Sequence, residues 1–238
     1  MVSFTMGQKS IKVFPSAKPN KPVIYLNTFN HEGDQVLQQV NASVREEFSL
    51  VEISNLKWNH DMVPWDVPPV MKNDDPYTGG ANEYLHMLLN DILPEAEKAI
   101  VGNPSWRGIA GYSLAGLFAL YAMYQTTVFS RIASVSGSLW FPGIKNFIFS
   151  HELTNKPDCI YFSLGSRERK TRNKILQRVQ ENTEEIEVFF KKQGIETIFQ
   201  LNPGNHFQDG ALRCALGIEW MLTGRKKSYN YGSHKKDL

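Results

Sequence analysis

The chain has 238 residues, of which 42% are hydrophobic and 21% charged, and its formal net charge is +2. This composition excludes a disordered chain, and the length suits one domain with a large core. Residues 225–238 hold five lysines and arginines and a single acid, so residues 1–224 are slightly acidic overall and lack the basic surface that binds nucleic acid. We therefore predict one domain over 1–224, a basic flexible tail over 225–238, and no nucleic-acid partner.

The expected compartment follows from the N-terminal segment and from two cysteines. The first residues show no apolar signal segment. Cys159 and Cys214 lie in apolar surroundings without a CxxC spacing, so we expect free, buried thiols and a reducing compartment. Residues 109–130 carry no charge and are long enough to cross a bilayer, but their glycines, serine and threonines follow a strand-turn pattern. We expect a buried strand and helix there, no membrane association, and a cytoplasmic protein.

The predicted elements alternate between strand and helix along the chain. In order they are a short strand 11–14, a strand 23–26, a helix 35–45, a strand 48–53, a long loop 54–79, a helix 81–99 that Pro94 kinks or divides, a strand 106–112, a helix 113–126, a strand 131–136, a strand 159–164, a helix 172–193, a strand 197–201 and a helix 211–222. Such alternation indicates an α/β fold with a mostly parallel sheet and helices on both faces. Functional groups of these sheets gather at the carboxyl ends of the strands.

A serine stands between one predicted strand and the helix that follows it, in Gly111-Tyr112-Ser113-Leu114-Ala115. A sharp strand-to-helix turn requires small neighbours, which Gly111 and Ala115 supply, although Ala115 replaces the commoner glycine. The helix N-terminus aims backbone N–H groups at developing negative charge. We interpret Ser113 as a nucleophile and the Leu114 N–H as an oxyanion donor, the alternative being a Gly-Ser turn that only connects two elements.

A base and an acid are needed to activate the serine. His206 lies in a glycine-containing loop after the last strand, and Glu168 follows the strand 159–164, which gives the chain order Ser113, Glu168, His206. The alternative for Glu168 is a solvated ion pair with neighbouring cations, and Asp209 is the reserve candidate for orienting His206.

The second oxyanion donor and the pocket are predicted from position alone. The loop after the strand 23–26 offers the N–H of Phe29 or Thr28, of which we take Phe29. Aromatic side chains expected to line the substrate pocket are Trp58, Trp65, Trp140 and Phe207. No metal-binding or nucleotide-binding motif occurs, so we expect no metal and no cofactor.

Several segments together resemble a known family. VIYLNTFNHEGD, GYSLAGLFALYAMY, YFSLGSRERKTRN and NPGNHFQDGAL are similar to the putative-esterase branch of the α/β-hydrolases, which includes enterochelin (siderophore) esterases, feruloyl esterases and S-formylglutathione hydrolases. The resemblance implies a single-domain α/β-hydrolase fold in which Ser113 matches the nucleophile, His206 the base and Glu168 the acid. Asn27 and Thr28 stand where relatives often show His-Gly.

The predicted function is hydrolysis of a carboxylic ester by a serine esterase through an acyl-enzyme intermediate. Its substrate would be a small-molecule ester, with siderophore, aromatic, short-chain and thioester compounds all open. Two alternatives remain, a hydrolase-fold binding protein without turnover and an acyltransferase that uses the same residues.

Overall fold

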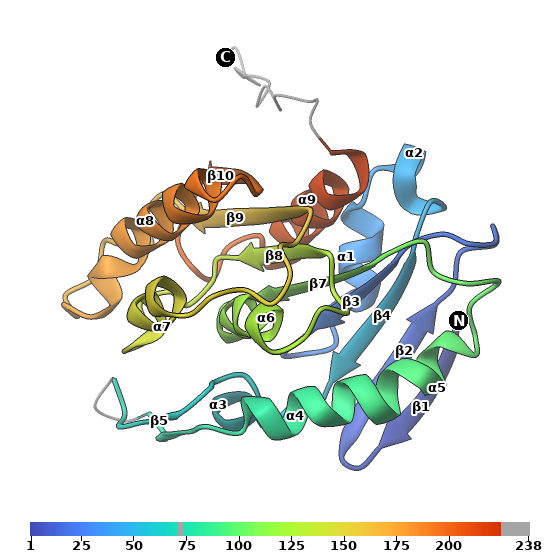
Figure 1. Cartoon of the computed structure of the whole chain (residues 1–238), viewed down its shortest axis with the longest axis horizontal. Helices are drawn as coiled ribbons and strands as arrows, with labels where there is room; N and C mark the ends of the chain where they lie inside the picture. The colour runs from blue at the N-terminus through green and yellow to red at the C-terminus, as the bar shows by residue number, and fades with distance from the viewer. Residues whose placement is uncertain (71–73, 225–238) are drawn as a thin grey trace, which may run out of the picture.

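An eight-stranded sheet forms the centre of the molecule (Figure 1). The structure, a computed structural model, describes residues 1–70 and 74–224, so the predicted tail 225–238 lies outside the described residues. In spatial order the strands are β1 (Val2–Met6), β2 (Lys9–Phe14), β4 (Ser49–Ser54), β3 (Val23–Asn27), β7 (Arg107–Tyr112), β8 (Arg131–Val135), β9 (Cys159–Gly165) and β10 (Glu196–Asn202). The pairs from β4 to β10 are parallel, whereas β1–β2 and β2–β4 are antiparallel. The predicted α/β class with a mostly parallel sheet is confirmed.

Helices pack on both faces of this sheet. One apolar cluster lies between the sheet and α4 (Ala81–Met87), α6 (Leu114–Gln125) and α8 (Val179–Lys192), and a second lies between the other face and α1 (Gly33–Gln39) and α9 (Gly210–Thr223). Alternate residues of a strand reach opposite clusters, as Ile109 and Ala110 of β7 do. The remaining described elements are α2 (Ala42–Arg45), α3 (Trp58–Asp61), β5 (Asp66–Val67), β6 (Tyr77–Thr78), the π-helix η1 (Leu88–Ile92), α5 (Leu93–Glu97), α7 (Ile144–Ser150) and the 3₁₀-helix η2 (Leu176–Arg178).

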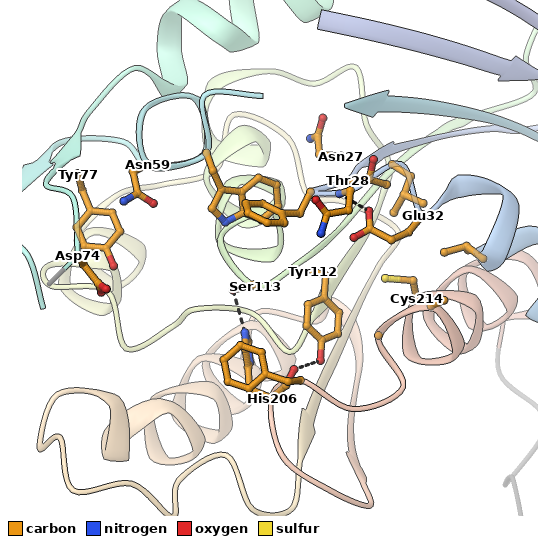
Figure 2. Close-up of a pocket in the computed structure, with 18 of the residues that line it drawn as sticks. Asn27, Thr28, Glu32, Asn59, Asp74, Tyr77, Tyr112, Ser113, His206 and Cys214 are labelled. Atoms are coloured by element: carbon orange, nitrogen blue, oxygen red, sulfur yellow. Dashed lines mark hydrogen bonds between the residues drawn. The ribbon is translucent and has the colours of Figure 1, made fainter. Parts of the chain in front are cut away.

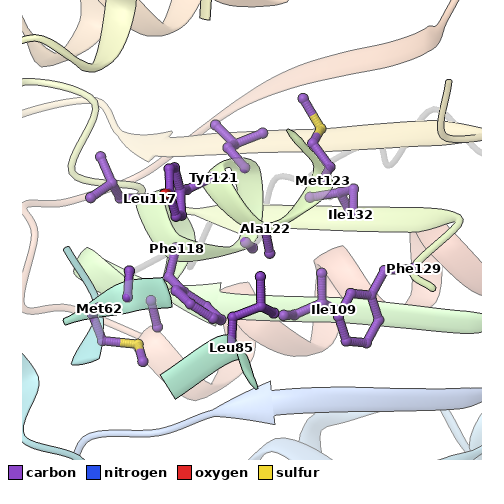
Figure 3. Packing of buried hydrophobic residues seen from close by; sticks show 14 of the residues in the cluster. Met62, Leu85, Ile109, Leu117, Phe118, Tyr121, Ala122, Met123, Phe129 and Ile132 are labelled. Carbon is purple, nitrogen blue, oxygen red and sulfur yellow. The ribbon is translucent and has the colours of Figure 1, made fainter. Parts of the chain in front are cut away.

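The uncharged stretch 109–130 is a strand and a buried helix, as the sequence predicts. Every residue of α6 from Leu114 to Tyr124 is buried, and Phe118 packs among residues of α4 and the sheet (Figure 3). A helix surrounded by protein on all sides has no solvent-facing stripe, which explains its lack of charge. Within residues 1–70 and 74–224, no helix has the length and apolar character needed to cross a membrane.

Several predicted boundaries are wrong, each for a local reason. The predicted helix 35–45 is two helices, because the side chain of Asn41 accepts a hydrogen bond from the Ser43 N–H and starts α2 anew. The predicted division of the helix 81–99 at Pro94 is confirmed, since η1 interrupts it just before this proline, which cannot donate the hydrogen bond of a regular helix, but the last part, α5, already ends at Glu97. The predicted helix 172–193 begins later, at η2 and α8.

Five elements were not predicted. β1 completes an antiparallel hairpin with β2 at one edge of the sheet, and α7 follows β8 along the chain. The other three, α3 and the small β5–β6 pair, lie in the predicted loop 54–79.

Candidate active site

Ser113 occupies a strained turn between β7 and α6. Its φ of 60° and ψ of −122° lie in a region that side chains rarely adopt, and its N–H donates to the Val135 carbonyl of β8 at 3.0 Å. A Cβ at Gly111 would lie 2.4 Å from the backbone of Ala115. Glycine is therefore required at position 111. Because Gly111 has no Cβ, there is room beside it for the methyl group of Ala115. The turn holds the Ser113 hydroxyl at the carboxyl end of the sheet.

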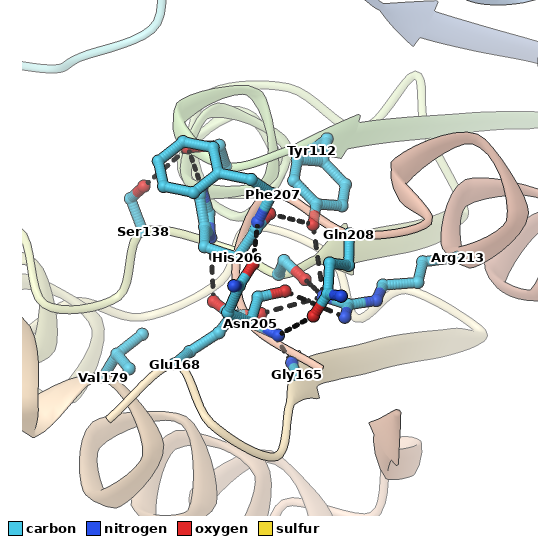
Figure 4. A network of polar contacts seen from close by, with 12 residues as sticks. Tyr112, Ser138, Gly165, Glu168, Val179, Asn205, His206, Phe207, Gln208 and Arg213 are labelled. Carbon is cyan, nitrogen blue, oxygen red and sulfur yellow. Dashed lines mark hydrogen bonds and ion pairs between the residues drawn. The ribbon is translucent and has the colours of Figure 1, made fainter. Parts of the chain in front are cut away.

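The side chains of Ser113, His206 and Glu168 form a continuous chain of hydrogen bonds. Figure 2 shows the contact of Ser113 with His206, and Figure 4 shows that of His206 with Glu168. His206 Nε2 lies 3.0 Å from Ser113 Oγ, and His206 Nδ1 lies 2.8 Å from Glu168 Oε2. The two partners come from the loops that follow β10 and β9, so parallel strands bring together residues that are 93 positions apart. Asp209, the reserve candidate, is exposed at the N-cap of α9, and Glu168 occupies the Nδ1 side of the ring instead.

Glu168 is held as a buried carboxylate. Its side chain is 3% exposed, and its second oxygen accepts hydrogen bonds from the Gly165 N–H at 2.5 Å and from Arg213 Nη1 at 3.1 Å. Burial opposes ionisation, but the hydrogen bond and charge of His206, together with the Gly165 N–H, outweigh it and lower the pKa of Glu168. The carboxylate therefore stays negative beside the imidazole, unlike the solvated ion pair considered from sequence.

Arg213 is the residue of this site that the sequence analysis missed. It lies in α9, is 1% exposed, and its two terminal nitrogens donate to five oxygen atoms, those of Tyr112 Oη, Ser136 Oγ, Glu168 Oε1 and the carbonyls of Pro203 and Asn205. The Tyr112 hydroxyl in turn donates to the His206 carbonyl at 2.6 Å. One guanidinium thus fixes both the acid turn and the histidine loop. An arginine within the otherwise apolar run 211–218 was the available signal.

The Ser113–His206 pair lies where two cavities meet, one of about 850 Å³ and one of about 460 Å³ (Figure 2). Of the predicted pocket aromatics, Trp58 and Phe207 line both cavities and Trp140 lines the smaller one. Phe29 lines the larger cavity, where its ring meets Trp58 edge to face at 5.1 Å.

The prediction for Trp65 is wrong. Its ring packs against Phe141 and Phe147 instead of lining either cavity, and its Nε1–H donates to the Pro142 carbonyl at 2.9 Å. The only hydrogen-bond donor of the indole is thereby satisfied inside the protein, so Trp65 contributes to packing and does not line the substrate pocket.

The backbone N–H groups of Leu114 and Phe29 have no acceptor within the described residues. Leu114 is the first residue of α6, and Phe29 lines the larger cavity together with Ser113. The Thr28 N–H, the other option from sequence, donates to the Ile53 carbonyl at 2.9 Å and is therefore occupied. Leu114 and Phe29 remain the predicted oxyanion donors.

Cys214 also lines the larger cavity but is a poor alternative nucleophile. Burial raises the pKa of its thiol to about 12, so the reactive thiolate is absent at neutral pH. In the described part of the chain, no group of three or more His, Cys, Asp or Glu side chains is placed to hold a metal ion.

The sequence of the chain matches a known family, and its fold resembles several solved structures. Residues 27–207 match the sequence model of the family described as "Putative esterase". The uncharacterized protein YbbA of Bacillus subtilis (strain 168) is 25% identical over 176 residues, which cover 71% of this chain and 70% of YbbA. Among solved structures, the siderophore hydrolase EstA from Aspergillus nidulans superimposes with a TM-score of 0.77 at 18% identity over 93% of both chains. EstB, a siderophore hydrolase of the same organism, gives 0.70 at 20% identity over 92% of this chain and 93% of its own.

Proposed function

The chain belongs to the putative-esterase family of carboxylic-ester hydrolases, and we propose that Ser113, His206 and Glu168 are its catalytic triad. The observation that carries the proposal is the 3.0 Å contact between Ser113 Oγ and His206 Nε2, because a serine hydroxyl attacks an ester only with a base within hydrogen-bond reach. The strained turn holds the half-buried Ser113 hydroxyl at the two cavities, which leave space for a substrate.

Acylation begins when the Ser113 hydroxyl attacks the ester carbonyl and His206 Nε2 takes its proton. The negative charge that develops on the carbonyl oxygen is stabilised by the N–H groups of Leu114 and Phe29. His206 then gives its proton to the leaving alcohol, and the acyl group stays on Ser113. In the second half, His206 activates a water molecule that releases the acid and regenerates the hydroxyl.

Glu168 and Arg213 act on the histidine. The carboxylate accepts the Nδ1–H, which fixes the tautomer with a free Nε2 and stabilises the imidazolium formed during attack. Arg213 is a positioning residue, because it touches Glu168 and the histidine loop and not the reacting atoms.

The substrate is proposed to be a small-molecule ester. The larger cavity has the size of a small-molecule site and is walled partly by aromatic rings. Since EstA and EstB are siderophore hydrolases, ester-linked siderophores are the first candidates in a panel that also contains aromatic, short-chain and thioester compounds, compared by kcat/KM. Addition of alcohol acceptors to the same reactions separates hydrolysis from acyl transfer.

A fluorophosphonate probe tests the proposal directly, because it phosphonylates only an activated serine. We expect the wild type to be labelled at Ser113 and to lose activity in proportion, while Ser113→Ala is not labelled. Equal labelling of Ser113→Ala, or an active wild type that resists the probe, would contradict the assignment and favour a binding protein built on the hydrolase fold.

A further inference from the structure

The segment 28–33, which joins β3 to α1, is fastened to the end of the neighbouring strand β4. The Thr28 N–H donates to the Ile53 carbonyl at 2.9 Å, and His31 Nδ1 lies 2.7 Å from Ser54 Oγ. We call residues 28–33 the oxyanion loop, because Phe29 supplies the second predicted oxyanion donor. In the view of Figure 2, Thr28 and His206 lie on opposite sides of Ser113.

The strongest attachment of the oxyanion loop is a fully buried carboxylate, that of Glu52 in β4. Its side chain is 0% exposed, and Oε1 accepts hydrogen bonds from Thr28 Oγ1 at 3.0 Å and from the Gly33 N–H at 2.7 Å. A Cβ at Gly33 would lie 2.7 Å from this carboxylate, so glycine is needed for the close approach. One oxygen atom therefore holds both ends of the loop.

This carboxylate is only partly compensated. Among the described residues, Oε2 has no hydrogen-bond partner, and Lys12 Nζ lies 4.0 Å away while making a 3.1 Å hydrogen bond to Asp34. A fully buried carboxylate costs stability when one of its oxygen atoms accepts no hydrogen bond. An apolar residue at position 52 would stabilise the fold better than a glutamate. The glutamate therefore suggests a role in the active site to which the oxyanion loop belongs.

We propose that Glu52, acting through Thr28 and Gly33, positions the Phe29 N–H for the oxyanion. The N–H groups on either side are already occupied, that of Thr28 by the Ile53 carbonyl and that of Asn30 by Glu32 Oε2 at 2.9 Å. Phe29 alone of these three points its N–H at no protein acceptor within the described residues. Glu52 and Thr28 are positioning residues, and this role rests on the proposed esterase function.

Thr28→Val is the sharpest test, because valine keeps the shape of threonine and removes only the hydroxyl that Glu52 accepts. We expect kcat to fall by about tenfold to a hundredfold with KM unchanged, since a displaced oxyanion donor affects only the transition state. Phenylboronic acid, whose adduct with Ser113 is a tetrahedral anion, should bind more weakly by the same factor. Glu52→Ala should lower kcat at least as far, and Glu52→Gln, which keeps an oxygen acceptor, should recover part of the loss.

Ser49→Ala is the matched control. Ser49 is a buried residue at the other end of β4, where its hydroxyl accepts the Ser16 N–H, so its loss removes a comparable hydrogen bond away from the site. It should lower the melting temperature and leave kcat and boronate binding unchanged. If Thr28→Val behaves in the same way, the positioning role is wrong while the esterase proposal stands. If Ser113→Ala still hydrolyses ester, the proposed function itself has failed.

Discussion

The two halves of the Ser113–His206 pair are held in different ways. The Ser113 turn is fixed by local backbone geometry, through a glycine at 111 that admits the close approach of α6 and a positive φ at the serine itself. The His206 loop is fixed from a distance, by the buried side chain of Arg213 reaching back from α9 to two backbone carbonyls and to Glu168.

Activity therefore depends on the two halves in different ways. A change in the turn alters the path of the backbone, whereas a change at Arg213 leaves the turn intact and loosens the base and its acid. Activity requires both halves, since neither the hydroxyl nor the imidazole reacts alone.

The largest effect should come from removing either member of the pair. Ser113→Ala and His206→Ala are each expected to lower kcat by at least about 10⁴-fold, and the double variant should be no worse than either one, because the two groups act as a unit. Steady-state kinetics on an activated ester measures this. Additive losses in the double variant would show that the two residues work independently.

A methyl group at Gly111 should damage the turn. Gly111→Ala places a Cβ 2.4 Å from the backbone of Ala115, so we expect a loss of about 2 kcal/mol or more in unfolding free energy, measured by urea titration, and a large fall in kcat. Gly194→Ala is the control, because nothing lies within 4 Å of its added Cβ and its cost comes only from the positive φ of Gly194. The control should cost some stability and leave kcat unchanged, and an equal effect of the two variants on kcat would refute the special role of the turn.

Loss of the arginine should loosen the other half. Arg213→Met leaves the buried Glu168 without its arginine partner, for which we expect about 3 kcal/mol of destabilisation, and a fall of about tenfold to a hundredfold in kcat with KM unchanged. Arg213→Lys should recover less than half of the loss in log kcat, because a single ammonium cannot replace the forked contacts. A destabilised Arg213→Met enzyme with normal kcat would show that Arg213 supports only the fold.

The smallest effect concerns acid pH. Because the pKa of Glu168 is lowered by folding, the unfolded chain takes up this proton first as the pH falls, and the stability contributed by Glu168 is lost between the ordinary glutamate pKa and its lowered folded value. As the pH falls through the ordinary glutamate pKa toward the lowered folded value, the wild type should therefore lose stability faster than Glu168→Gln. Chemical denaturation across this range measures the difference, and a steeper loss in the variant would have the wrong sign.

The same contrast explains what the sequence could predict. The strand-turn-helix pattern around Ser113 is local, and the chain order of Glu168 and His206 follows from apolar strands and the carboxyl-end rule. Arg213 could not be assigned a role, because its partners come from four separate segments of the chain. Glu52 lies in the predicted strand 48–53, but its burial could not be predicted, because every residue of β4 is buried and not only the apolar ones.

The prediction that Trp65 lines the substrate pocket was wrong for a related reason. An aromatic residue in a polar loop is equally compatible with a pocket wall and with a core contact, and the deciding partner, the Pro142 carbonyl, lies 77 residues away. Packing between distant segments leaves no periodic trace in the sequence.

The central claim is that the acyl group passes through Ser113 Oγ. Mass spectrometry of enzyme quenched during turnover of p-nitrophenyl acetate, followed by peptide mapping, tests this most directly. We predict one acetyl group on Ser113 during turnover, absent once the ester is exhausted and absent in Ser113→Ala. Full turnover by Ser113→Ala, or an acetyl group that accumulates on another residue at the rate of catalysis, would contradict the account.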